Sequence, residues 1–241
     1  MRPFARRRLG ILVTVGISVG FLAWPVSTRQ AVDYVVTERT IPLGLKAGSF
    51  IHRDLAYRRL AAGITRGIPL GEERAVALIE WVRRNIRPSS PGVPIVDDHI
   101  LSIIERGHGT SDQVADVFTT LATYAGLPAF WGVLRLKKGE PDWILSFVRI
   151  EGRWTAWEAW RGGAFRDASG ALLDVEALSA HPDLARLTLG DASHLGIGYE
   201  AYLKHGLAEA FMVPATIRAE KQMLGRRILF EARKLLHRDA G

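Results

Sequence analysis

The sequence predicts an α+β fold, in which helices precede and follow a short antiparallel sheet. Helix-type apolar patterns dominate residues 50–124, three strand-like segments lie within residues 129–160, and helix patterns return from Val175. Helices that are segregated from antiparallel strands define this fold class. About 215 residues remain beyond an apolar N-terminal segment, which suits one domain with additions at both ends.

The N-terminus combines a cationic cluster with an apolar segment. Four arginines among the first eight residues precede eighteen mainly apolar residues, Leu9 to Val26. About 17–25 apolar residues span a bilayer as a helix, and cationic flanks stay in the cytoplasm. We expect a single-pass inner-membrane anchor at residues 9–26, with a cytoplasmic N-terminus and an extracytoplasmic, periplasmic domain. The alternative is a cleaved signal peptide, whose apolar part is usually about 7–15 residues long.

The net charge of +7 comes from the two ends of the chain. Residues 215–241 carry seven Lys or Arg against three acids, and the four N-terminal arginines supply the rest of the excess. Basic ends on a membrane-tethered protein fit anionic lipid headgroups, so we expect such contact through residues 217–238. The alternative is a C-terminal helix that packs on the domain with its charges in water. The sequence has no nucleic-acid-binding motif, and we expect no nucleic-acid partner.

The first half of the chain predicts four elements before the sheet. Weak patterns suggest a short strand at 34–36 and a helix over 50–67. Pro69 and Gly71 introduce an amphipathic helix, and a short helix covers residues 97–106. The buried stripe of the amphipathic helix is expected at Ala75, Leu78, Ile79, Val82 and Ile86.

A Gly-rich turn at residues 107–110 leads into a helix predicted to run from Ser111 to Tyr124. Thr110 or Ser111 fits the N-cap, and Gly126 fits a left-handed C-cap. Strands follow at 129–136, 143–150 and 153–160, the last two joined by a tight Glu151-Gly152 turn. Helices are expected from residue 175 onward, the longest at 217–237.

Several phrases in this order resemble transglutaminase-like domains of the bacterial type, which have a papain-like, cysteine-protease-like core. RAVALIEWVRRNIRP resembles their opening helix, and RGHGTSDQVADVFTTLATYAGLPAFWGVL is similar to their nucleophile segment. DWILSFVRIEGRWTAWEAW resembles the strands that carry the catalytic histidine and acid. The resemblance implies a core over residues 69–178 in which the nucleophile helix packs on an antiparallel sheet. Residues 1–27, 28–68 and 179–241 are then the anchor, a lead-in strand and helix, and a C-terminal helical extension.

The resemblance places Ser111 at the position of the catalytic cysteine and Glu158 at that of the acid. Trp143 falls on the histidine position, or Asp142 does if the register slips by one. The chain has no cysteine, and no histidine lies between residues 129 and 160. Because a helix dipole cannot ionise a serine hydroxyl, Ser111 needs a base that these strands lack. We therefore expect a catalytically inactive binding or scaffold domain of the cell envelope, in an exopolysaccharide-related context suggested by the family.

Two further functions stay open. In a serine hydrolase or acyltransferase, Ser111 would attack, His108 or His99 would be the base, and Glu158 would orient it. In a structural subunit of a membrane complex, the basic ends would make the contacts. We expect no metal and no other cofactor, because the seven histidines show no ligand-like spacing.

Aromatic residues are dense on the three predicted strands. Alternate residues of a strand face opposite sides, so these rings cannot all belong to one core face. Aromatics on a concave surface bind sugars or peptide side chains by stacking, whereas the alternative is packing against flanking helices. The candidate binding residues, for an envelope protein or glycan partner, are Trp131, Trp143, Trp157 and Glu158.

Overall fold

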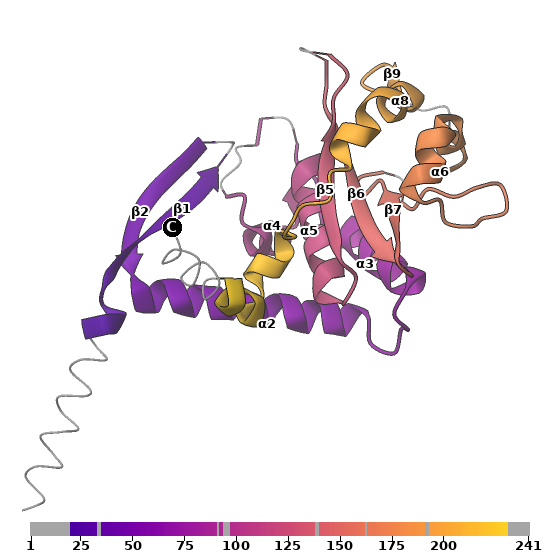
Figure 1. Ribbon diagram of the computed structural model, residues 1–241. Coiled ribbons are helices and arrows are strands. Elements are labelled where there is room, and N and C mark those ends of the chain that lie inside the picture. Colours follow the sequence, from indigo (N-terminus) through magenta and orange to yellow (C-terminus); the bar gives the residue numbers. More distant parts are fainter. Residues whose placement is uncertain are drawn as a thin grey trace, which may run out of the picture.

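A three-stranded antiparallel sheet with helices on both faces forms the centre of the molecule (Figure 1). The computed structural model describes residues 20–32, 35–90, 92–93, 97–137, 140–161, 163–190 and 193–230. The sheet has the order β5 (Ala129–Leu134), β6 (Trp143–Ile150), β7 (Arg153–Trp157). Glu151 and Gly152 connect β6 to β7 with positive φ angles of 49° and 85°, as a tight hairpin turn requires. The predicted combination of helices with an antiparallel sheet is confirmed.

The segment before the core differs from the prediction. β1 (Pro25–Val32) and β2 (Val35–Pro42) pair as an antiparallel hairpin, and α2 (Leu43–Ile64) is a 22-residue helix. The sequence analysis expected only a short strand at 34–36 and a helix from residue 50. The first turns of α2 have no apolar stripe to reveal them, because its buried residues are only Asp54, Tyr57 and Ala61. Figure 1 shows the hairpin at the N-terminal end of α2, away from the central sheet.

The expected membrane anchor at residues 9–26 lies mostly outside the described residues, which begin at residue 20. Residues 20–22 are helical, and Pro25 begins β1. Within the described ranges, no helix is both long enough and apolar enough to cross a membrane.

One face of the sheet packs against the helices that precede it. α3 (Glu72–Asn85) buries Ala75, Leu78, Ile79 and Val82 as predicted, and Ile86 follows them into the core. α4 (Ile100–Arg106) ends at Gly107, whose φ is 69°. α5 (Ser111–Tyr124) runs through this core, and its residues from Gln113 to Thr123 are all buried. This first core therefore fixes both ends of α5 relative to the sheet.

The opposite face of the sheet is covered by the C-terminal elements. They are α6 (Val175–Ala180), η1 (Pro182–Leu184), α7 (Ala185–Leu189), β8 (Ser193–His194), β9 (Ile197–Gly198) and α8 (Tyr199–Ala210). Trp143, Leu145 and Phe147 alternate along β6 into this second core, where Tyr202 and Leu203 of α8 meet them. The C-terminal helices thus complete the surroundings of Trp143 on β6.

The prediction of one long helix over residues 217–237 is wrong for its first residues. Arg218 precedes a short 3-10 helix, η2 (Ala219–Gln222), and Met223 is extended with φ −75° and ψ 125°. Helix resumes over residues 224–230, and residues 231–241 lie outside the described part. Ile217 and Ala219 are buried against the domain, so tertiary contacts override the helical periodicity at this point.

Candidate functional site

Ser111 is the first residue of α5 and follows a turn that side chains hold in place. β3 (Arg87–Pro88) pairs in parallel with β4 (His108–Gly109), directly before the helix. The Gln113 side-chain carbonyl accepts hydrogen bonds from the Thr110 backbone N–H at 3.2 Å and from Arg106 at 2.6 Å. Thr110 is the N-cap residue, one of the two expected. The turn therefore presents Ser111 at a fixed helix N-terminus, which is where the nucleophile of a transglutaminase-like site is expected.

Ser111, Trp143 and Glu158, the three positions that the sequence resemblance singles out, meet at one cavity of about 180 Å³. Ser111 comes from α5, Trp143 from the start of β6, and Glu158 follows the last residue of β7. The remaining lining residues are Ile144, Trp160, Arg161, His194 and Tyr199. We call this space the Ser111 cavity. It is smaller than the roughly 300–1,000 Å³ of pockets that enclose a whole drug-sized ligand.

Trp143 is held by other aromatic rings. It is 2% exposed, and its ring centroid lies 4.6 Å from that of Tyr199 and 5.8 Å from that of Tyr202. Phe165 makes an edge contact at 6.3 Å. A bulky indole packed by three aromatic neighbours thus stands where the family resemblance places an imidazole. Indole nitrogen is only a donor, so Trp143 cannot accept a proton.

Glu158 is buried, and its carboxylate accepts a hydrogen bond from the backbone N–H of Arg161. This contact closes the chain tightly after β7 and directs Arg161 and Trp160 to the rim of the Ser111 cavity. A buried carboxylate with hydrogen-bond donors is suited to orienting a neighbouring polar group or to fixing the local backbone.

The imidazole at the Ser111 cavity is that of His194 on β8. Its Nε2 lies 2.9 Å from the carbonyl oxygen of Asp142, so Nε2 carries the proton in this contact. His194 and Tyr199 both lie outside residues 69–178, the stretch that resembles the transglutaminase-like family. Sequence reasoning missed both residues, because no local motif connects residues 194–199 to α5.

The two histidines proposed from the sequence lie elsewhere. His108 Nδ1 is 3.1 Å from the Ser89 hydroxyl, and the ring borders a different cavity with Arg84 and Arg87. His99 lines a third cavity beside Arg53. Neither imidazole lines the Ser111 cavity.

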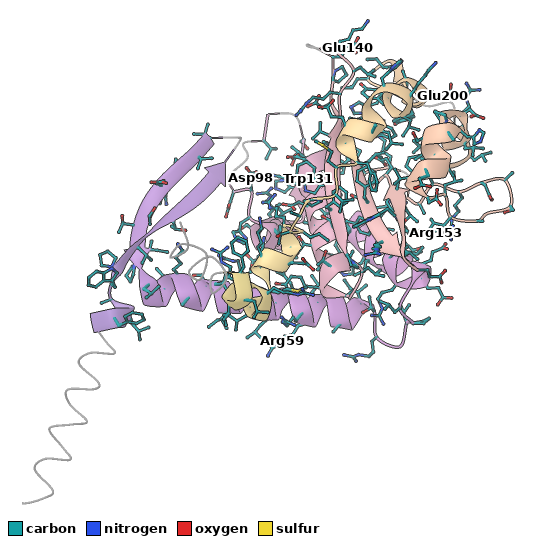
Figure 2. The ribbon with its side chains drawn as sticks, viewed as in Figure 1. Arg59, Asp98, Trp131, Glu140, Arg153 and Glu200 are labelled. Carbon is teal, nitrogen blue, oxygen red and sulfur yellow. The ribbon has the colours of Figure 1, made fainter. Side chains whose placement is uncertain are left out.

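Two of the candidate binding tryptophans also lie apart from the Ser111 cavity. Trp157 is 0% exposed, donates to the Thr155 hydroxyl at 2.8 Å, and packs on Phe118. A side chain without exposed surface cannot contact a partner, so Trp157 is a core residue. Trp131 is half-buried and donates its indole N–H to Asp116 at 3.2 Å. Figure 2 labels Trp131 on β5.

Across the described part of the chain, no three His, Asp or Glu side chains gather closely enough to hold a metal ion. The side chains that line the Ser111 cavity supply a hydroxyl, a carboxylate, an imidazole, a guanidinium and aromatic rings.

Solved structures with a similar arrangement include a candidate cysteine protease from Cytophaga hutchinsonii, with 17% identity and a TM-score of 0.39. The match covers 45% of this chain and 38% of that protein. A candidate protease from Parabacteroides distasonis has 12% identity and a TM-score of 0.35, over 56% of this chain and 36% of its own. A TGase has 12% identity and a TM-score of 0.38, with coverages of 55% and 43%. The chain thus spans less than half of each of these structures.

No curated protein matches the sequence significantly. The sequence model of the transglutaminase-like superfamily matches residues 58–165. This range contains the C-terminal end of α2 from residue 58, all of α3 to β7, and the three residues Ser111, Trp143 and Glu158. Residues 58–165 of this chain therefore form a domain of the transglutaminase-like superfamily.

Proposed function

We propose that this transglutaminase-like domain binds a partner at the Ser111 cavity and does not catalyse a transglutaminase-type reaction. The observation that carries the proposal is the position of Trp143, a packed indole where a proton-accepting imidazole would be needed. Ser111 supports it as well, because a serine hydroxyl at a helix N-terminus stays protonated without an adjacent base. The chain has no cysteine that could replace it.

The bound group is the size of one side chain or one sugar substituent. A cavity of about 180 Å³ accepts such a group from a larger partner. The half-buried Trp160 and the buried Tyr199 line the cavity, and aromatic faces stack on sugar rings and peptide side chains. An envelope glycan or an envelope protein is therefore the partner class that we propose.

Binding is tested with immobilised cell-envelope glycans and peptides and the full-length protein. Trp160→Ala is expected to weaken binding by about tenfold, the usual scale for a stacking contact. Trp24→Ala is the matched control, because Trp24 is 65% exposed and lies in the N-terminal segment. Equal binding by both variants would refute the assignment of the Ser111 cavity as the binding site.

A serine hydrolase is the second candidate, and His194 is the observation that favours it. With Nε2–H donating to the Asp142 carbonyl, Nδ1 is the nitrogen of His194 that could accept a proton, and His194 lines the Ser111 cavity. A fluorophosphonate probe separates the two candidates. Labelling of the wild type that is lost in both Ser111→Ala and His194→Gln would establish the hydrolase, and no labelling is expected for a binding domain.

We further propose that residues 9–26 attach the domain to the inner membrane with residues 28–241 outside the cytoplasm. The apolar length and the N-terminal arginines support this orientation. An alkaline phosphatase fusion after residue 241 is expected to be active, and the N-terminal residues should remain in the mature protein. Loss of those residues would indicate a cleaved signal peptide instead.

Sedimentation with anionic vesicles, with and without residues 217–241, tests the proposed lipid contact of the basic C-terminus.

A further inference from the structure

The cavity that His99 lines lies between the β1–β2 hairpin, α2, residues 97–100 and η2, and it has a volume of about 450 Å³. None of the residues of the Ser111 cavity lines it. Most of its wall comes from residues 28–53 and 218–222, which lie outside the range that matches the superfamily. Its volume falls within the roughly 300–1,000 Å³ typical of small-ligand pockets. We call it the Arg53 cavity.

Arg53 is the central cation of this space. Its side chain belongs to α2, is half-buried, and also borders an adjoining cavity of about 390 Å³. Among the residues that the structure describes, none forms a hydrogen bond or an ion pair with its guanidinium. A partly desolvated cation without a counter-ion is unfavourable, and an anion that reaches it would be stabilised.

The two acidic residues that line the cavity, Asp97 and Asp98, accept hydrogen bonds from neighbouring residues. The Asp97 carboxylate accepts hydrogen bonds from the His99 backbone N–H and the Ser102 hydroxyl, both at 2.9 Å. Asp98 accepts one from Gln113 at 2.6 Å. These contacts fix the loop before α4 and leave the charges of Asp97 and Asp98 in the cavity wall. Among the described residues, neither carboxylate forms an ion pair with Arg53.

Two further cations face the same space. Lys46 donates to the Ser27 carbonyl at 2.6 Å, a contact that leaves its charge unneutralised. Arg218 pairs with the buried Asp116 at 2.8 Å, while 61% of its side chain stays exposed. The apolar part of the wall consists of Ile41, Phe50 and Ile100.

His99 is a partly buried, neutral group in the wall of the cavity. Burial lowers the pKa of its imidazole to about 4, and the positive charges of Arg53 and Arg218 act in the same direction. The Asp97 carboxylate opposes them. The imidazole is therefore neutral at pH 7, and it offers a hydrogen bond without adding a charge.

We propose that the Arg53 cavity binds a small oxyanion, a carboxylate or a phosphate group carried on a compact apolar body. The planar guanidinium of Arg53 suits both groups, because it donates two parallel hydrogen bonds to neighbouring oxygens. Lys46 and Arg218 add long-range attraction, and Phe50 and Ile100 cover the apolar body. The site is separate from the Ser111 cavity and does not depend on its function.

Calorimetric titration of the full-length protein with inorganic phosphate and with benzoate tests the proposal. We expect saturable one-site binding of at least one anion to the wild type and about tenfold weaker binding to Arg53→Gln. Arg59→Gln is the matched control, because Arg59 is an exposed residue of the same helix, labelled in Figure 2. Absence of saturable binding to the wild type, or equal affinities of all three proteins, would overturn the proposal.

Two additional measurements keep the result interpretable. The Cε1 proton of His99, followed by NMR, should shift with saturation in the wild type and in Arg59→Gln, which places the anion beside the imidazole. Arg53→Lys keeps the positive charge but cannot donate two parallel hydrogen bonds. Its affinity for the anion is therefore expected to lie between those of the wild type and Arg53→Gln. Phosphatidylglycerol vesicles distinguish the source of the oxyanion: Arg53-dependent vesicle binding assigns a lipid headgroup, and binding of free anions alone assigns a soluble metabolite.

Discussion

Arg218 and Asp116 form an ion pair of 2.8 Å that joins the C-terminal segment to the middle of α5. The Trp131 indole N–H donates to the same carboxylate at 3.2 Å. Burial raises the pKa of Asp116, and the Arg218 charge and the Trp131 hydrogen bond oppose the rise. The segment after α8 is therefore held on the domain through a buried carboxylate, which a scan for apolar stripes does not detect.

Replacement of Arg218 by Met should lower the free energy of unfolding by about 1–3 kcal/mol. Breaking a fully buried pair removes about 3–5 kcal/mol, and the exposure of Arg218 reduces this amount. Urea unfolding measures the change. Arg226→Met is the control, since its 3.8 Å pair with Glu220 is largely exposed, and a change within about 0.5 kcal/mol is expected. Similar losses in both variants would contradict the assigned role of the pair.

Asp116→Asn tests the same pair from its buried side. In the Arg218→Met background it should restore part of the lost stability, because a neutral amide is less costly to bury than an unpaired carboxylate. A double variant no more stable than Arg218→Met alone would show that Asp116 is not the partner that matters.

Trp143→Ala should lower the free energy of unfolding by about 3–5 kcal/mol, because it removes a buried indole from contact with Tyr199, Tyr202 and Phe165. Trp143→His, which introduces the residue that the sequence resemblance places there, should also destabilise the protein and leave the fluorophosphonate reaction unchanged. Thermal and urea unfolding measure stability. Trp24→Ala, at an exposed position, should change it by less than about 0.5 kcal/mol.

The sequence predicted the elements whose periodicity is strong and local. α3 and α5 have continuous buried stripes, and β6 and β7 are joined by a turn with a diagnostic dipeptide. The hairpin and residues 43–49 of α2 were missed, because exposed residues on both faces give no periodic signal. Each element was therefore predictable to the degree that its own side chains enter the core.

The sequence predicted only those residues of the candidate site that lie on elements with a local pattern. Ser111, Trp143 and Glu158 lie on elements with local motifs, and the fold brings them to one cavity. His194 and Tyr199 arrive from the second core, through tertiary contacts between distant segments. Arg53 and Arg218 meet in the same way, although 164 intervening positions separate them in the chain. Spatial neighbours of this kind leave no pattern in a single sequence.

His99 should make the protein less stable as the pH falls from about 6.5 toward 4. Its imidazole has a pKa of about 4 in the folded protein against 6.5 in a free side chain, so the unfolded chain binds the extra proton in this range. Partial solvent screening limits the loss between pH 7 and 4.5 to about 1–2 kcal/mol. Urea unfolding at both pH values should show a smaller difference for His99→Gln. His205→Gln, at an exposed position of α8, should behave as the wild type does, and identical profiles for all three would refute the prediction.

Gly132 on β5 allows the backbone of α8 to approach the sheet, and any larger residue should separate them. A Cβ atom at this position would lie 2.2 Å from the carbonyl oxygen of Ala210, a distance that requires the backbone to move. Gly132→Ala is therefore expected to lower the free energy of unfolding by about 2–3 kcal/mol, by overpacking. Gly63→Ala is the control, because no atom lies within 4 Å of its added methyl group, and a helical alanine should stabilise α2 by up to about 1 kcal/mol. Since α8 carries Tyr199 into the wall of the Ser111 cavity, Gly132→Ala should also weaken partner binding. A loss of stability with unchanged partner binding would show that the position of α8 does not affect the proposed binding site.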